Sequence, residues 1–413
     1  MYDFANSAYT TVVITAVFNA YFVAEVAQNA PWATLAWTSA LAVSYVAIIL
    51  TAPLIGAYAD AHAAKKRLLA ITTIGCVVFT AGLALAGQDA LWMAIVLIVL
   101  SNFFFGTGEN LIAAFLPELA HEHSVGRISG WGWSLGYCGG LLALGVSLAY
   151  VTWAQARGEP AVEFVPVTML ITAAFFALSS LPTFLFLRER AQPAGGASNM
   201  AREAVSRLRT TLREASHYRD LRRFLLAVVF YQAGIQAVVA LAAVYAQQVM
   251  GFTTRDTLML VLVVNITAAV GAFVFGYVQD RFGHVPTLVA TMIGWILAIA
   301  LAYFANGPGL FWTAANLVGI CLGSSQSAAR ALVAYLSPPG RSAEFFGLWG
   351  LAVKLSAVLG PLTYGFVTWF TSGDHRLAIL LTGTYFLVGL AIIRGIDVIR
   401  GRKTALVAAG PPP

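Results

Sequence analysis

Long apolar runs of about 20 residues follow one another along almost the whole chain. A helix of that length crosses the hydrocarbon core of a bilayer, because each residue adds about 1.5 Å. Only a helix satisfies the backbone hydrogen bonds within such a run. The pattern predicts an all-α membrane protein with twelve spans, near residues 6–27, 35–59, 68–87, 91–115, 129–152, 165–187, 224–248, 257–279, 286–305, 309–333, 343–370 and 376–399.

One long polar segment separates the sixth predicted span from the seventh. It opens with a stretch rich in Pro, Gly and Ala, and then places apolar residues from Met200 to Leu212 at helical spacing among arginines. We expect either an amphipathic helix on the membrane surface or a solvated linker helix. The segment divides the chain into an N-terminal six-helix bundle (1–188), a cytoplasmic linker (189–223), a C-terminal six-helix bundle (224–400) and a cytoplasmic tail (401–413).

Composition and charge agree with this pattern. The chain is 59% hydrophobic and only 10% charged, whereas soluble domains carry about 25% charged residues. Of the 24 Lys and Arg residues, nineteen fall on one side of the predicted spans. The positive-inside rule therefore predicts that both termini and the linker are cytoplasmic. The net charge of +6 follows from this distribution, and we expect no nucleic-acid partner.

A short motif occurs twice at the end of an apolar run. The stretch PLIGAYADAHAAKKR contains Gly56 and Asp60, and GYVQDRFGH contains Gly276 and Asp280, so that a Gly precedes an Asp by four positions in both. The two acids are 220 residues apart, about half of the chain. Helical membrane proteins with such an internal repeat are most often transporters that hold their substrate between the two halves.

These motifs, together with YDFANSAYTTVV, AFLPELA, SGWGWSLGYCGG and SPPGRSAEFFGLWGLAVKLSAVLGP, resemble the major facilitator superfamily, and within it the vacuole-effluxer-like branch. The fungal members of that branch are autophagy-related vacuolar amino-acid exporters. The resemblance covers essentially the whole chain and implies a major-facilitator fold with two pseudo-symmetric bundles. The chain departs from the family pattern at Ala61, where an Arg is usual, since its basic residues stand later, at Lys65–Arg67.

The resemblance also implies a role for the repeated acids. Each acid would lie near the N-terminus of a span in the other half, the eleventh or the fifth, where the helix dipole and an Arg favour a carboxylate. Such contacts would close the cytoplasmic side and break when it opens. The alternative is that the acids only anchor their spans at the membrane surface. The gating candidates are Asp60, Arg127, Asp280, Arg281 and Arg341.

Ionisable residues inside spans are the clearest candidates for substrate binding, because a charge at the bilayer centre costs about 2.5–3.5 kcal/mol on insertion scales. Lys354 lies some twelve residues into the eleventh predicted span. It is a counter-charge for a substrate carboxylate or a partner for an acid within the membrane. Glu109 in the fourth span takes up a proton, binds a substrate ammonium, or pairs with Arg330 or Lys354.

Polar groups of the first, fourth and seventh spans complete the predicted cavity. Amides hydrogen-bond both carboxylates and ammonium groups and so suit a zwitterion, although each one alone is equally a contact between helices. Gln232 and Gln236 are four residues apart and share one helical face. The candidates are Asn6, Asn102, Asn110, Tyr231, Gln232 and Gln236.

No motif points to a cofactor, a metal or ATP. His121 and His123 lack the spacing of a zinc motif, and the chain has no phosphate-binding Gly-Lys-Ser/Thr loop. The sequence also shows no His/Asp or Ser/His constellation of an integral membrane enzyme.

We therefore expect a monomeric secondary transporter in a bacterial cytoplasmic membrane, with proton coupling and export of a small polar or zwitterionic solute, amino acids first. The alternatives are a pump for apolar drugs and a non-transporting sensor or scaffold of the same fold.

Overall fold

The computed structural model describes residues 1–28, 30, 32–87, 89–190, 218–252 and 254–408, and in them the chain is entirely helical apart from its connections. Within these residues, twelve helical segments are long and apolar enough to cross a membrane, and they match the twelve predicted spans one for one. The linker helix predicted around residues 200–212 lies outside the described residues.

The helices of the N-terminal half follow from its six apolar runs. A short helix, α6, and one 3₁₀ turn (Glu122–Ser124) lie between the fourth and fifth predicted spans. The helices are α1 (Tyr2–Ala8), α2 (Phe18–Tyr21), α3 (Ala33–Ala61), α4 (Lys65–Gly82), α5 (Leu91–Ala113), α6 (Leu116–Leu119), α7 (Val125–Ala156) and α8 (Ala161–Phe186).

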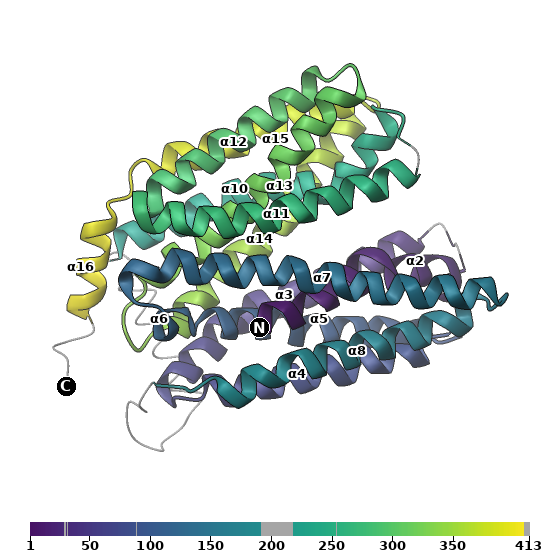
Figure 1. The fold of residues 1–413 in the computed structure, drawn as a ribbon, viewed down its shortest axis with the longest axis horizontal. Helices are drawn as coiled ribbons and strands as arrows, with labels where there is room; N and C mark the ends of the chain where they lie inside the picture. Colours follow the sequence, from purple (N-terminus) through teal and green to yellow (C-terminus); the bar gives the residue numbers. More distant parts are fainter. Residues whose placement is uncertain (29, 31, 88, 191–217, 253, 409–413) are drawn as a thin grey trace. The chain divides into compact units, whose positions relative to one another are not determined.

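The C-terminal half repeats this order. Helix α15 packs against both α10 and α12, and the last helix, α16, packs against α10 and α13 (Figure 1). The helices are α10 (Arg219–Gln248), α11 (Thr254–Phe282), α12 (His284–Phe304), α13 (Pro308–Leu336), α14 (Ser342–Phe370), α15 (His375–Ile393) and α16 (Val398–Ala408).

The predicted end of the twelfth span, residue 399, is wrong. Helix α15 ends at Ile393, and the separate helix α16 begins at Val398. Gly395 interrupts the helical run, and the Asp397 carboxylate accepts the N–H of Arg400 at 3.0 Å in the first turn of α16. A side-chain acceptor of this kind starts a new helix.

Close packing divides the chain into two compact units. The first comprises Met1–Thr51, Ala64–Ile112 and Leu135–Arg190, and the second comprises Ala52–Ala63, Ala113–Ser134 and Ala191–Pro413. The second unit therefore contains the end of α3, the whole of α6 and the beginning of α7 together with the described helices of the C-terminal half.

The first span departs from a regular α-helix. Two π-helical segments, Tyr9–Ala16 and Phe22–Val26, follow α1 and α2. Single π turns inside helices often occur at functional sites, and here the first segment begins three residues after Asn6. Nothing in the local sequence of this span predicts them.

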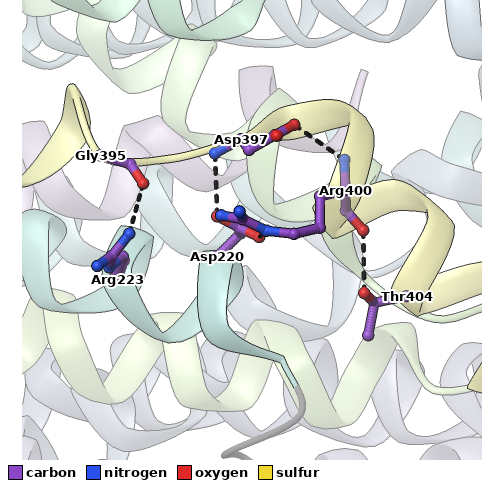
Figure 2. A network of polar contacts seen from close by, with 6 residues as sticks. All are labelled: Asp220, Arg223, Gly395, Asp397, Arg400 and Thr404. Atoms are coloured by element: carbon purple, nitrogen blue, oxygen red, sulfur yellow. Dashed lines mark hydrogen bonds and ion pairs between the residues drawn. The ribbon is translucent and has the colours of Figure 1, made fainter.

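An ion-pair network fastens α16 to the beginning of α10 (Figure 2). Asp220 accepts two hydrogen bonds from the guanidinium of Arg400, at 2.6 and 2.8 Å, and a third from the backbone N–H of Asp397 at 2.9 Å. Arg223 donates to the carbonyl oxygen of Gly395 at 2.7 Å. The Asp220 carboxylate raises the pKa of Arg400 above its usual value, so this cation stays charged.

Glycines bring the helices of the second unit into backbone contact. A Cβ atom at Gly360 of α14 would overlap the carbonyl oxygen of Ala233 in α10, and one at Gly323 of α13 would overlap that of Ala268 in α11. Membrane helices associate through such small residues, because lipid gives no hydrophobic driving force between them.

This packing gives a matched pair of substitutions in α14. We expect Gly360→Ala to destabilise the protein by about 1–3 kcal/mol, because the added methyl group forces α14 away from α10. Gly365→Ala should be neutral or slightly stabilising, because a Cβ there meets no atom within 4 Å and Ala is the better helix former. Thermal unfolding in one detergent compares the two, and equal melting temperatures would contradict the close contact.

Candidate functional site

The repeated acid of the C-terminal half binds the beginning of α7. The two carboxylate oxygens of Asp280, at the end of α11, accept the backbone N–H groups of Gly126 and Arg127 at 2.8 and 3.0 Å. These N–H groups belong to the first turn of α7 and have no acceptor within their own helix. The carboxylate also meets the positive end of the helix dipole. All of these residues lie in the second unit.

The glycine of the motif makes this contact possible. Gly276 lies one turn before Asp280, and a Cβ there would come within 2.9 Å of the carbonyl oxygen of Gly126. Gly130 of α7 faces the backbone of Ala272 in the same way. Because both helices present glycine at their crossing, the short side chain of Asp280 reaches the backbone of α7. We call this crossing the α7–α11 contact.

The first copy of the motif makes an equivalent contact with α14. Asp60 at the end of α3 accepts the backbone N–H of Glu344 at 2.9 Å. Gly56 lies against the backbone of Ala343, and Gly347 of α14 lies against that of Ala52. This crossing, the α3–α14 contact, also lies within the second unit. The structure thus places both acids at the helix ends that the family resemblance implied.

Arg341 stands at the same helix end. Its guanidinium binds the Glu344 carboxylate through two hydrogen bonds of 3.0 and 3.2 Å and reaches the Tyr218 hydroxyl at 3.4 Å. Glu344 is fully buried, so its charge requires this partner. Glu344 is not among the gating candidates, although its spacing of three residues from Arg341 indicates a pair on one helical face.

The other two gating candidates differ in their surroundings. Arg127 joins the α7–α11 contact through its backbone N–H, while its guanidinium lies over the rings of Trp131 and Tyr277, at 5.8 and 5.9 Å from their centroids. Arg281 is exposed and lies 5.5 Å from the Phe282 ring centroid.

The displaced basic cluster Lys65–Arg67 stands at the beginning of α4 in the first unit. Cations are unfavourable at a helix N-terminus, but Glu189 offsets them by accepting the backbone N–H groups of Lys65 and Lys66 at 2.8 and 3.0 Å. Lys66 also donates to the carbonyl oxygen of Leu187 at 2.6 Å. The cluster thus connects α4 with the segment after α8.

The first unit contains four of the substrate-binding candidates. Asn6 and Asn110 are buried, and neither the Oδ1 atom of Asn6 nor the Nδ2 atom of Asn110 has a hydrogen-bond partner among the described residues. Asn102 donates to the hydroxyl of Ser44 and therefore joins α5 to α3. Glu109 in α5 is partly buried.

Tyr9 belongs to the same region, although it is not among the binding candidates. Its hydroxyl lies 2.8 Å from that of Ser101, and its ring stacks on Phe105 with 4.8 Å between the centroids. These contacts hold the first π-helical segment against α5.

The second unit contains the other four candidates. Gln232 of α10 is fully buried and donates through Nε2 to Oε1 of Gln326 in α13 at 2.8 Å. The Oε1 atom of Gln232 and the hydroxyl of the buried Tyr231 have no hydrogen-bond partner among the described residues. Gln236 and Lys354 are partly buried. The unused acceptor of Gln232 is a group that a donor on a ligand can satisfy.

Arg330 joins two helices of the second unit. It is buried in α13 and donates to the hydroxyl and the carbonyl oxygen of Ser129 in α7, at 3.2 and 2.9 Å. Its guanidinium also lies 5.4 Å from the ring centroid of Trp133. It therefore joins α13 to the beginning of α7. The two residues are 201 positions apart, so no local sequence pattern predicts this contact.

The chain is similar to one bacterial and several fungal membrane-protein relatives of known sequence. It is 27% identical over 402 residues to YxiO of Bacillus subtilis, described as an uncharacterized MFS-type transporter, with 95% of this chain and 92% of that protein covered. It is 26% identical over 335 residues to autophagy-related protein 22-1 of Aspergillus fumigatus, with 74% and 54% covered. The chain thus spans about half the length of this fungal relative.

Solved structures share the fold at low sequence identity. The fucose:proton symporter FucP of E. coli has a TM-score of 0.74 at 15% identity, covering 96% of both chains. The human organic anion transporter MFSD10 has a TM-score of 0.73 at 15% identity, covering 95% of this chain and 97% of that one. These likenesses establish the major-facilitator fold. The family model for vacuole effluxer Atg22-like proteins matches residues 20–406, and the chain is therefore a member of this branch of the major facilitator superfamily, an integral membrane transporter.

Proposed function

We propose that this transporter exports a small zwitterionic solute, with amino acids as the first candidates, and couples export to protons. The observation that carries the proposal is a set of buried oxygen atoms in the first spans of the two halves that have no hydrogen-bond partner among the described residues. They are Oδ1 of Asn6 in α1, and the hydroxyl of Tyr231 and Oε1 of Gln232 in α10. An unpaired buried polar atom is costly, and a polar substrate removes that cost when it binds.

The two ionisable residues inside spans supply the charges for a zwitterion. Lys354 is suited to bind a carboxylate, and Glu109 is suited to bind an ammonium group or a proton, because each lies within a span and carries the opposite charge to that group. The description of the matched family as vacuole effluxers supports export as the direction. The proton coupling of FucP is a precedent on the same fold, and it belongs to that protein.

We further propose that the α7–α11 and α3–α14 contacts act as a gate on the side that the distribution of Lys and Arg predicts to be cytoplasmic. Each contact joins a span of one half to a span of the other through one carboxylate and one pair of glycines. Breaking a carboxylate's bonds to helix N–H groups costs about 1 kcal/mol. Such a contact therefore forms and breaks readily in each transport cycle.

The substrate assignment is tested by uptake of labelled amino acids into proteoliposomes with and without an imposed pH gradient. We expect saturable uptake that the gradient stimulates, and loss of at least about 90% of it in Lys354→Ala, because removing a charged partner costs about 1.5–3 kcal/mol. Lys403→Ala is the matched control, since Lys403 is exposed in α16. Equal uptake by Lys354→Ala and Lys403→Ala would show that Lys354 does not bind the substrate.

No flux of any amino acid would reject the substrate assignment. If apolar drugs were then transported, the drug-efflux alternative would replace it. If nothing were transported, the hypothesis of a non-transporting sensor or scaffold with the same fold would replace it.

The gate is tested by Asp60→Asn and Asp280→Asn in the same vesicles. Asn replaces one acceptor oxygen by a donor, so the side chain at position 280 satisfies only one of the two N–H groups of α7. We expect each variant to change the maximal transport rate by about fivefold or more, with a smaller effect on the half-saturating concentration.

Asp374→Asn is the control for the gate. Asp374 accepts the N–H of Leu377 at 2.9 Å at the beginning of its own helix, α15, where Asn caps about as well as Asp. It should transport as the wild type does. An unchanged rate in both motif variants would show that the acids only anchor their spans.

A further inference from the structure

Aromatic and cationic side chains gather on the surface of the α7–α11 contact. Arg127 and Trp131 are one turn apart at the beginning of α7, and Phe273 and Tyr277 are one turn apart near the end of α11. The indole N–H of Trp131 donates to the Tyr277 hydroxyl at 3.2 Å, and the rings of Phe273 and Tyr277 meet edge to face at 5.4 Å. All four residues lie in the second unit.

The guanidinium of Arg127 has capacity for a further ligand. Asp280 uses both carboxylate oxygens on the backbone N–H groups of Gly126 and Arg127. The guanidinium instead lies over the Trp131 and Tyr277 rings, to one side of both, and its buried Nε has no hydrogen-bond partner among the described residues. An Arg offers five N–H donors in a planar fork that matches a phosphate.

The Tyr277 hydroxyl adds a second donor at the same place. It accepts a hydrogen bond from Trp131, and its own proton is therefore directed to a different acceptor. Trp131 and Tyr277 are each 42% exposed, so their polar atoms stand at the surface of the unit. Trp, Tyr and Arg side chains of this kind are typical of the interface between lipid and water.

An apolar strip continues from this group along α11. Phe273, Val270 and Ile266 precede Tyr277 by four, seven and eleven residues, so they share its helical face, and all three are exposed. The face thus offers a cation and a hydroxyl donor at one end and an apolar surface next to them. An anionic phospholipid has the complementary order of groups, a negatively charged phosphate followed by apolar acyl chains.

We propose that Arg127, Trp131 and Tyr277 bind the headgroup phosphate of an anionic phospholipid, with an acyl chain along Phe273, Val270 and Ile266. Basic pockets between spans on the cytoplasmic side suit such headgroups, and the distribution of Lys and Arg predicts that side here. The lipid contacts both α7 and α11. It therefore binds more tightly when Asp280 holds the two helices together, and it stabilises that arrangement in turn.

The test compares lipids retained by the purified, delipidated transporter after equal loading with phosphatidylglycerol or phosphatidylcholine. Native mass spectrometry counts bound lipids, and thermal unfolding reports their effect. We expect the wild type to retain phosphatidylglycerol preferentially and to melt at a higher temperature with it. Arg127→Gln and Tyr277→Phe should each lower phosphatidylglycerol retention by about tenfold, the loss expected for one charge-assisted hydrogen bond.

Arg157→Gln is the matched control. Arg157 follows the other end of α7 and also lies over an exposed tryptophan, Trp153, at 4.5 Å, but it pairs with Glu159 at 3.7 Å. Its substitution should leave retention unchanged. Tyr277→Phe removes a single oxygen atom and keeps the ring, so it separates lipid binding from folding.

Equal retention of the two lipids by the wild type would overturn the proposal, as would undiminished phosphatidylglycerol retention in both variants. The readout involves no transport, so its outcome is independent of the substrate assignment.

Discussion

The arrangement of the second unit depends on one constraint, that a short carboxylate must reach the backbone of a neighbouring helix. Asp280 and Asp60 do so only because glycines one turn away, Gly276 and Gly56, let the helices touch. A larger side chain at either glycine would separate the helices by more than an aspartate side chain can span. The spacing of four residues within the motif therefore has a direct geometric cause, since it sets the glycine and the acid on one helical face.

The same constraint explains why the two halves share a motif but not all of their contacts. At the α7–α11 contact the carboxylate binds two N–H groups, and the nearby Arg127 turns its guanidinium to aromatic rings. At the α3–α14 contact the carboxylate accepts the N–H of Glu344, and Arg341 neutralises the buried Glu344. The arginine near each motif therefore has a different partner: aromatic rings for Arg127 and a carboxylate for Arg341. The two contacts need not be equally strong.

Much of the fold could be predicted from the sequence because the hydrophobic pattern and the internal repeat are local properties of the chain. Twelve apolar runs predicted twelve spans, and the family resemblance, not the motif alone, implied which helix ends the two acids meet. The hydrogen-bond partners of the buried polar residues could not be predicted from local patterns. Gln232 and Gln326 are 94 residues apart, and Arg330 and Ser129 are 201 residues apart. The π-helical segments of the first span also depend on tertiary packing, for Tyr9 and its neighbours have no residue type that requires them.

The network that joins Asp220 to Arg400 has a consequence for the order of assembly. Its two residues are 180 positions apart and enclose all six spans of the C-terminal half. Spans enter the membrane in the order of their synthesis, and α16 follows the last of them. This ion pair therefore forms only after the whole half has been inserted. A chain that stops before Arg400 would leave the buried Asp220 without its cation, and cellular quality control would encounter an incomplete protein with an uncompensated charge.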